Sequence, residues 1–240
     1  MRADQYLVHH GHYDSRARAQ SAIKAGKVTI DGVPARKASQ TIASGAKVVA
    51  EAEHPWVSRG GLKLFHALEV FGVKPDGLQC LDVGSSTGGF TQVLLERGAA
   101  KVCAVDVGQG QLHSFLHNHP RLISLENQDA RDLTENLIGF APDLVVCDAS
   151  FIGLSKVLEI PLSLAAPRAK LVSLVKPQFE VGRDGIGRGG LVKSEELALQ
   201  SLENVKTWLA GLGWEVKADD VSPIKGGSGN TEYLIWAERG

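Results

Sequence analysis

The pattern of apolar and polar positions changes near residue 60. After that point, short apolar runs alternate with segments of helical periodicity. The runs predict five consecutive strands, at residues 78–83, 101–107, 121–126, 142–148 and 169–176. Strands and helices that alternate in this way are typical of a doubly wound α/β fold with a mainly parallel sheet.

Two more apolar runs, residues 214–221 and 232–238, follow a predicted helix that begins near Ser194 and ends at Gly211 or Gly213. The two runs leave no room for a helix between them. We therefore expect an antiparallel pair at one edge of the sheet. Together the runs predict a Rossmann-like α/β domain with a seven-stranded, mostly parallel sheet and an antiparallel edge strand.

The first fifty residues follow a different pattern. Residues 1–15 contain a short amphipathic helix that should end near Gly11, and a second helix should stop at Gly26. The alternating stretch that follows surrounds Asp31-Gly32, the dipeptide that best favours a two-residue hairpin turn. A compact unit of two helices and a hairpin is therefore expected.

These patterns predict a small α+β domain over residues 1–50, a linker over 51–60 and the α/β domain over 61–240.

The net charge differs between the small domain and the rest of the chain. The chain has a formal net charge of −1, yet residues 1–50 hold eight Lys or Arg against three Asp, a net +5, and the remainder carries −6. This asymmetry indicates a module that binds a polyanion, the alternative being a merely solvated basic surface.

Three motifs of the basic module occur in order: R-x-D at residues 2–4, SR-x-x-A at 15–19 and I-x-x-G-x-V-x-I-D-G at 23–32. Together they resemble the S4 RNA-binding domain, which implies a structured RNA partner but no particular chemistry. Its cations would contact phosphates without reading the base sequence. The expected RNA-binding residues are Arg2, Arg16, Arg18, Lys24, Lys27, Arg36 and Lys37, with Arg59 in the linker.

Composition narrows the class of protein. No run approaches the roughly 18 apolar residues that span a bilayer, and the polar start lacks a signal-peptide core, so a cytoplasmic protein is expected. Cys80, Cys103 and Cys147 lie in or at the ends of apolar runs, which predicts buried thiols rather than a disulfide or a zinc site. The His clusters at 9–12 and 113–119 lack acidic or Cys partners at ligand spacing, so no metal is expected.

The first strand of the large domain ends in DVGSSTGGF, where Gly84, Gly88 and Gly89 would let the backbone approach a ligand at the next helix N-terminus. The second strand ends at Asp106, 22 residues after Gly84, where a carboxylate can accept both hydroxyls of a ribose. Asp129, after the third strand, is placed to contact an adenine amino group, or is a surface residue without such a role. A nucleoside-containing cofactor is indicated.

The glycine spacing G-x-x-x-G-G resembles the loop of methyltransferases that bind S-adenosylmethionine, whereas dinucleotide folds usually show G-x-G-x-x-G. A dehydrogenase is the minor alternative. The expected cofactor-binding residues are Asp82, Gly84, Ser85, Ser86, Gly88, Gly89, Phe90, Asp106, Asp129 and Asp148.

The fourth strand ends in C-D-A-S-F, residues 147–151. Many nitrogen-directed methyltransferases carry an Asp or Asn followed by two prolines and an aromatic there, and cytosine-carbon enzymes use a Cys that typically follows Pro. Because this chain has neither, oxygen remains as the common acceptor. A weakly acidic hydroxyl needs a base or a stabilising cation, and Lys suits both roles.

Lys176 ends the fifth strand beside the predicted cofactor loop, and Glu232 begins the last strand at the same rim if that strand is antiparallel. With Lys63 and Asp148 they resemble the K-D-K-E tetrad of FtsJ-like ribose 2′-O-methyltransferases. At the junction of the linker and the large domain, Gly60 and Gly61 should let the chain turn into the first helix of that domain.

Over nearly the whole chain, the S4 module and the strings VSRGGLKL, DVGSSTGGFT, CDASFI, VKPQFEVGR, SPIKG and GNTEYL resemble the TlyA family. The resemblance implies S-adenosylmethionine-dependent methylation of cytidine ribose 2′-hydroxyls in ribosomal RNA, with Lys176 as the central catalytic residue and Lys63, Asp148 and Glu232 beside it. It favours the large ribosomal subunit over the small one, and a monomer or weak homo-oligomer.

Two other functions remain open. Some family members were labelled haemolysins, but no exported or membrane-spanning segment is visible in the sequence. A catalytically inactive RNA-binding protein is the second alternative, which the complete glycine loop and tetrad disfavour. The glycine-rich loop at residues 182–190 has no assigned role beyond covering an RNA site.

Overall fold

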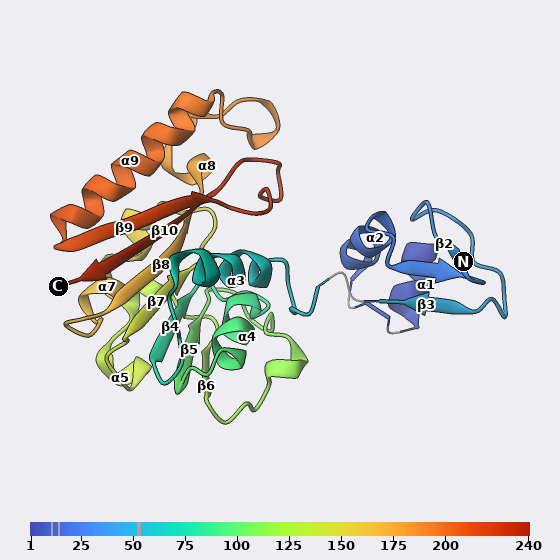
Figure 1. Cartoon of the computed structure of the whole chain (residues 1–240), viewed down its shortest axis with the longest axis horizontal. Helices are drawn as coiled ribbons and strands as arrows, with labels where there is room; N and C mark the ends of the chain where they lie inside the picture. The colour runs from blue at the N-terminus through green and yellow to red at the C-terminus, as the bar shows by residue number, and fades with distance from the viewer. Residues whose placement is uncertain (11, 14, 52–53) are drawn as a thin grey trace. The chain divides into compact units, whose positions relative to one another are not determined.

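The computed structural model describes residues 1–10, 12–13, 15–51 and 54–240. Gly11, the predicted end of the first helix, and residues 52–53 of the predicted linker lie outside them. The chain forms two compact units, Met1–Pro55 and Trp56–Gly240, drawn in Figure 1.

The smaller unit contains α1 (Ala3–His9), α2 (Arg16–Lys24) and a three-stranded antiparallel sheet of β1 (Val28–Ile30), β2 (Val33–Pro34) and β3 (Val48–Ala50), in the order β2-β1-β3. Ser15 caps α2 by accepting the backbone N–H of Arg18. Asp31 and Gly32 have φ values of +51° and +79°, as a two-residue hairpin turn requires. The two helices and the hairpin are confirmed.

Strand β3 was missed by the sequence reasoning. It is three residues long and pairs with β1 about twenty positions away, so that Thr29 lies opposite Val49. Its formation depends on a partner that is not adjacent in sequence, and three residues carry too little alternation to reveal it.

The larger unit has a seven-stranded sheet with the order β6-β5-β4-β7-β8-β10-β9. The strands are β4 (Gln79–Val83), β5 (Lys101–Val105), β6 (Leu122–Leu125), β7 (Leu144–Cys147), β8 (Lys170–Val175), β9 (Trp214–Val221) and β10 (Tyr233–Arg239). The first five are parallel, and β10 is antiparallel to both β8 and β9. The predicted fold class is confirmed, with β9 as the outer strand of the antiparallel pair.

The helices lie on both faces of this sheet. They are α3 (Gly60–Phe71), α4 (Gly89–Glu96), α5 (Glu135–Ile138), α6 (Leu154–Val157), α7 (Glu159–Ser163), α8 (Pro177–Glu180) and α9 (Glu195–Gly211), the last capped by Ser194 as predicted. Alternate strand residues point to opposite faces. One core cluster therefore joins Leu81 to α9, and the other joins Cys80 to α3 and α4.

All three cysteines are free and buried, as predicted. Burial raises the pKa of the Cys103 and Cys147 thiols to about 12, so they are inert packing residues. Within the described residues, no group of three or more His, Cys, Asp or Glu could hold a metal ion. No helix in that part of the chain has both the length and the apolar surface needed to cross a membrane.

Candidate active site

The glycine loop connects β4 to α4 in a tight turn. Gly84 and Ser85 donate their backbone N–H groups to the carbonyl of Val105, at 2.9 and 3.1 Å. Gly84 has a φ of +79°, and a Cβ there would lie 2.8 Å from the Cα of Ala149. Glycine is therefore required for the ends of β4 and β7 to come this close.

Asp106 follows β5 and fastens this loop. Its two carboxylate oxygens accept the backbone N–H of Ser86 at 2.8 Å and of Gly108 at 2.7 Å. A carboxylate has about four lone-pair sites, so Asp106 retains capacity to accept from a ligand. It lines a cavity of about 460 Å³, here called the strand-end cavity, whose other walls include Val107 and Ile152.

Asp129 lies in the same cavity but already has a partner. The Arg131 guanidinium donates to its two oxygens at 3.0 and 2.6 Å and lowers the pKa of the carboxyl. Asp129 also caps the short 3-10 helix Ala130–Asp132 by accepting the backbone N–H of Arg131. Any ligand amino group would share this carboxylate with Arg131.

Asp82 is placed differently from the other predicted cofactor residues. Its carboxyl group is fully buried, accepts the hydroxyl of Thr91 at 2.6 Å and lines neither of the two large cavities. Burial raises its pKa to about 7. Its contribution is to join β4 to the first turn of α4 beneath the loop, rather than to touch a ligand.

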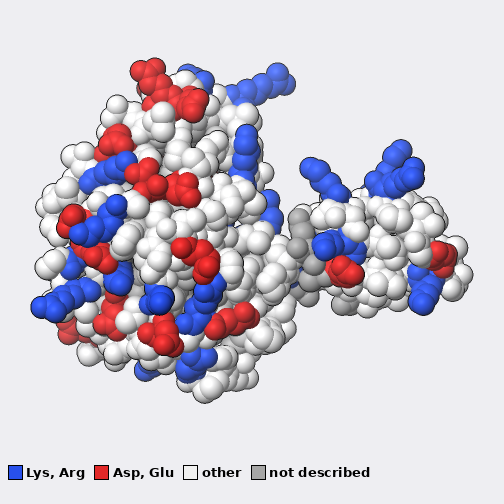
Figure 2. Space-filling model, in the orientation of Figure 1, with Lys and Arg blue, Asp and Glu red and all other residues white. Residues whose placement is uncertain are grey.

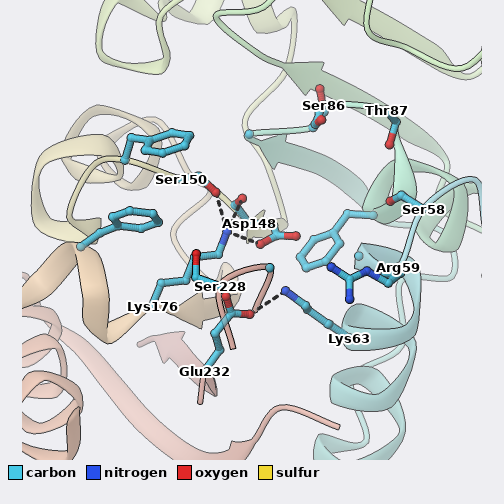
Figure 3. A pocket seen from close by; sticks show the side chains of 18 of the residues that line it. Ser58, Arg59, Lys63, Ser86, Thr87, Asp148, Ser150, Lys176, Ser228 and Glu232 are labelled. Atoms are coloured by element: carbon cyan, nitrogen blue, oxygen red, sulfur yellow. Dashed lines mark hydrogen bonds and ion pairs between the residues drawn. The ribbon is translucent and has the colours of Figure 1, made fainter. Parts of the chain in front are cut away.

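Lys176, at the end of β8, is 7% exposed and is held by three oxygens. Its Nζ lies 2.6 Å from the Asp148 carboxylate, 3.0 Å from the Asp148 carbonyl and 2.9 Å from the Ser150 hydroxyl (Figure 3). Pro177 begins α8 directly after it. These contacts fix the ammonium group at the point where β7 and β8 end.

Lys63 and Glu232 form a second ion pair, with Nζ 2.6 Å from Oε2. Lys63 comes from α3 and Glu232 directly precedes β10, and both side chains are buried. A Cβ at Gly226 would overlap the Glu232 carboxylate, so the loop before β10 must carry glycine there. The antiparallel direction of β10 brings its first residues to the carboxyl ends of the parallel strands.

The four tetrad residues therefore form two ion pairs around one cavity of about 410 Å³, here called the tetrad cavity. Figure 3 shows the two pairs next to each other. The tetrad and strand-end cavities share Gly84, Ser86, Asp148, Ser150 and Phe151. A molecule in the strand-end cavity can thus present one end to the two lysines.

The sequence had suggested that the glycines of SRGGLKL form a turn before the helix, and this prediction is wrong. Gly60 and Gly61 are the first residues of α3. A Cβ at Gly60 would lie 3.2 Å from the Asp148 carboxylate, and one at Gly61 would overlap the Trp56 ring. They are small because the helix packs against the site, while Arg59 is exposed and lines the tetrad cavity.

Sequence reasoning missed an aromatic pair beside the lysines. Phe151 is 90% exposed and has a φ of +68°, a conformation that is costly for a bulky residue. Its ring centroid lies 5.3 Å from that of Phe179, and both residues line the tetrad cavity. The available signal was the aromatic after D-A-S, at the place where related enzymes carry one.

Helix α8 contacts the segment that carries Phe151. Glu180 accepts the backbone N–H of Leu154 at 2.8 Å, and Phe179 packs on Phe151. Burial raises the pKa of the Glu180 carboxyl. Lys176 and α8 together therefore contact the loop after β7 at three points.

The cations of the smaller unit differ in how they are engaged. Arg2 and Arg16 both donate to the buried carboxylate of Asp4, at distances of 3.0 and 2.9 Å for their shortest contacts. Lys27 lies 3.6 Å from Glu51. Lys24, Arg36 and Lys37 are exposed, and Figure 2 shows basic side chains projecting from this unit.

Comparison with known families supports the division of the chain. The family described as FtsJ-like methyltransferase matches residues 56–239, and the S4 domain matches residues 1–48. A 16S/23S rRNA (cytidine-2'-O)-methyltransferase named TlyA, from Mycobacterium tuberculosis, is 48% identical, covering 98% of this chain and 88% of that protein. Hemolysin A of Brachyspira hyodysenteriae is 37% identical, with 98% of each chain covered.

Solved structures agree with these matches. A hemolysin-labelled protein from Streptococcus thermophilus has a TM-score of 0.79 and 36% identity, covering 100% of this chain and 88% of that one. Magnesium protoporphyrin IX methyltransferase from Synechocystis PCC 6803 with bound SAH has a TM-score of 0.52 at 16% identity, covering 76% of this chain and 83% of that one. The second likeness shows the fold alone.

Proposed function

Because this chain belongs to the FtsJ-like methyltransferases and, within them, to the TlyA family, we propose that it transfers a methyl group from S-adenosylmethionine to the ribose 2′-hydroxyl of a cytidine in ribosomal RNA. The observation that carries the proposal is the pair of Lys–carboxylate contacts at 2.6 Å in the tetrad cavity, directly beside the strand-end cavity.

The strand-end cavity fits an adenosine-containing cofactor. Asp106 offers acceptors for ribose hydroxyls, Asp129 offers one for an adenine amino group, and apolar side chains including Val107 and Ile152 suit a flat ring. The residues proposed to hold the cofactor are Gly84, Ser85, Ser86, Gly88, Gly89, Phe90, Asp106, Asp129 and Asp148, with Asp82 supporting the loop from below. When bound, S-adenosylmethionine supplies an electrophilic sulfonium methyl group.

Lys176 is proposed to act on the attacking hydroxyl. Developing negative charge on the 2′-oxygen is stabilised by a nearby cation, and a buried cation does this better than one in water. Asp148 and Ser150 hold the Lys176 ammonium in place, so it needs no reorganisation during the reaction. The hydroxyl proton is released to solvent as negative charge develops on the oxygen.

The second pair, Lys63 and Glu232, is proposed to hold the ribose next to the first pair. Lys63 comes from α3, and Glu232 directly precedes β10. The pair brings no net charge to the cavity and adds a second donor and acceptor for sugar hydroxyls. The acceptor base is proposed to stack on Phe151, since an exposed ring beside the lysines offers a flat face to an extruded base.

Residues 1–50 are proposed as the RNA-anchoring module, 51–60 as the linker and 61–240 as the catalytic domain. The module would contact phosphates through Arg2, Arg16, Arg18, Lys24, Lys27, Arg36 and Lys37, with Arg59 beside the tetrad cavity. Arg2 and Arg16 would do so with the surface left free by Asp4. We expect a cytoplasmic monomer or weak homo-oligomer that favours the large ribosomal subunit over the small one. A Campylobacter jejuni relative is named for 23S rRNA alone, and the Mycobacterium tuberculosis relative for 16S and 23S rRNA.

The proposal is tested by mass spectrometry of ribosomal RNA from cells with and without the gene, and after incubation of each subunit with the purified chain and S-adenosylmethionine. The expected result is one ribose methyl group that disappears from a cytidine in the deletion strain and is restored in vitro. Ribosomal RNA with the same methylation in both strains would contradict it.

A further inference from the structure

The glycine-rich segment left without a role by the sequence forms a small hairpin, residues 182–193, here called the glycine-rich hairpin. Ile186 and Val192 form an antiparallel bridge, and the Gly187 N–H donates to the Leu191 carbonyl at 2.7 Å. The Lys193 N–H donates to the Gly185 carbonyl at 3.0 Å. The segment is thus an ordered element rather than an unsupported loop.

One buried side chain fastens the hairpin to the loop before β10. Asn230 is 5% exposed, its Oδ1 accepts the Val192 N–H at 2.9 Å, and its Nδ2 donates to the Gly190 carbonyl at 2.9 Å. Its own carbonyl accepts the N–H of Gly226, also at 2.9 Å. A side-chain amide provides the donor and acceptor that this bridge needs, whereas a carboxylate provides acceptors only.

The loop held by Asn230 reaches the tetrad cavity on its other side. Gly227 and Ser228 line that cavity, and Glu232 lies two residues after Asn230. Figure 1 shows the two loops side by side, the orange one before α9 and the red one before β10. The hairpin therefore stands directly behind the loop that contributes to the rim of the site.

The hairpin and its neighbour are basic. Residues 182–193 contain Arg183, Arg188 and Lys193 against Asp184, a net charge of +2, and the adjacent loop adds Lys225. All four cations are exposed. The rest of the chain beyond residue 50 is acidic on balance, and the first turn of α9 adds Glu195 and Glu196 directly after the hairpin. The excess of positive charge is therefore confined to the hairpin and the adjacent loop, whose residues Gly227 and Ser228 line the tetrad cavity.

We infer that the glycine-rich hairpin is an RNA-backbone contact of the catalytic unit, and that Asn230 is a positioning residue that holds it at the rim. Arg183, Arg188 and Lys193 would contact phosphates next to the target nucleotide, independently of base sequence. The inference rests on the proposed function, because it assumes that RNA enters the tetrad cavity.

The first test compares Arg183→Ala/Arg188→Ala with wild type in methylation of ribosomal subunits over a range of salt concentrations. Loss of two phosphate contacts should raise the KM for RNA about tenfold and reduce the slope of log KM against log salt by about two. The KM for S-adenosylmethionine should not change. Arg168→Ala is the matched control, since Arg168 is exposed and precedes β8 at the opposite end of the strands.

The second test asks whether Asn230 acts through the hairpin. Asn230→Ala should also raise the KM for RNA about tenfold, and adding it to Arg183→Ala/Arg188→Ala should change little more, because both remove the same contact. If Asn230 instead had a separate structural role, the increases in KM for RNA caused by Asn230→Ala and by Arg183→Ala/Arg188→Ala would multiply in the combined variant. Thermal unfolding of each variant shows whether the catalytic unit remains folded.

An unchanged KM and salt slope in Arg183→Ala/Arg188→Ala would overturn the inference while leaving the proposed function intact. If wild type methylates no ribosomal RNA, the proposed function fails instead. Filter binding of the same RNA to both proteins then still tests the hairpin, and equal affinities and salt slopes would overturn it.

Discussion

Each unit of this chain places a carboxylate against one or more cations, and the two arrangements differ in function. In residues 1–55, Asp4 has no exposed surface and accepts hydrogen bonds from Arg2, Arg16 and Gln20 at 2.8–3.3 Å. In residues 56–240, Asp148 meets Lys176 at 2.6 Å on the wall of the tetrad cavity.

The difference lies in what remains available after pairing. Asp4 also accepts the backbone N–H of Gln5, so its acceptor sites are used within the protein and it ties α1 to α2. Lys176 lines the tetrad cavity, which is large enough for a ligand. The Asp148 carbonyl and the Ser150 hydroxyl accept from its ammonium group and hold it in this position. In this chain, the ion pair that borders a cavity is the candidate for chemistry, whereas the pair without a cavity joins two helices.

The largest expected effect is on the catalytic side of this comparison. Lys176→Ala should lower turnover about 10³-fold, because it removes the cation proposed to stabilise the attacking oxygen. The affinity for S-adenosylmethionine, measured by calorimetry, should stay within a few fold. A loss of cofactor binding as large as the loss of turnover would make Lys176 a cofactor residue instead.

Variants of the Lys63–Glu232 pair can distinguish a contribution to stability from a contribution to turnover. Lys63→Met leaves Glu232 buried without its partner and should destabilise the catalytic unit by about 3 kcal/mol in denaturant unfolding. Lys63→Met/Glu232→Gln should regain most of that stability while turnover remains about 10²-fold below wild type. Recovery of turnover together with stability would show that the pair only supports the fold.

Asp82 sharpens the comparison because it is buried without a cation. Its pKa is raised to about 7, so the folded state binds more protons than the unfolded state between pH 4 and pH 7. Its contribution to stability is therefore lost as the pH rises, by about 2 kcal/mol between pH 5.5 and 7. Asp82→Asn should flatten this part of the stability curve in denaturant unfolding at a series of pH values; an unchanged slope would contradict the assignment.

Asp4 should show the opposite dependence and the smallest effect near neutral pH. Hydrogen bonds from Arg2 and Arg16 lower its pKa, so the stability that it contributes is present above about pH 4 and is lost as the pH falls further. Asp4→Asn should remove this acid-dependent loss of stability. The measurement is acid unfolding of the full chain, monitored by circular dichroism. Arg2→Lys is a control that keeps the cation, and its acid transition should stay close to that of wild type.

Much of the fold followed from local sequence. The turn at Asp31-Gly32, the cap at Ser194 and the strand that ends at Lys176 depend on neighbouring residues and on periodicity, so they could be predicted. The glycines of SRGGLKL were misinterpreted because glycine marks both turns and close contacts. Their neighbours, Trp56 and Asp148, decide between the two.

The sequence by itself determined which chemical groups stand at the ends of the strands, because the parallel direction of the strands follows from their alternation with helices. The tertiary structure decided how those groups pair. Lys63 forms an ion pair with Glu232, 169 positions away. Lys176 contacts Asp148 and Ser150. Arg2 and Arg16 both form ion pairs with Asp4. Such pairings arise from packing between distant elements, and they separate the charges available for chemistry from those that stabilise the fold.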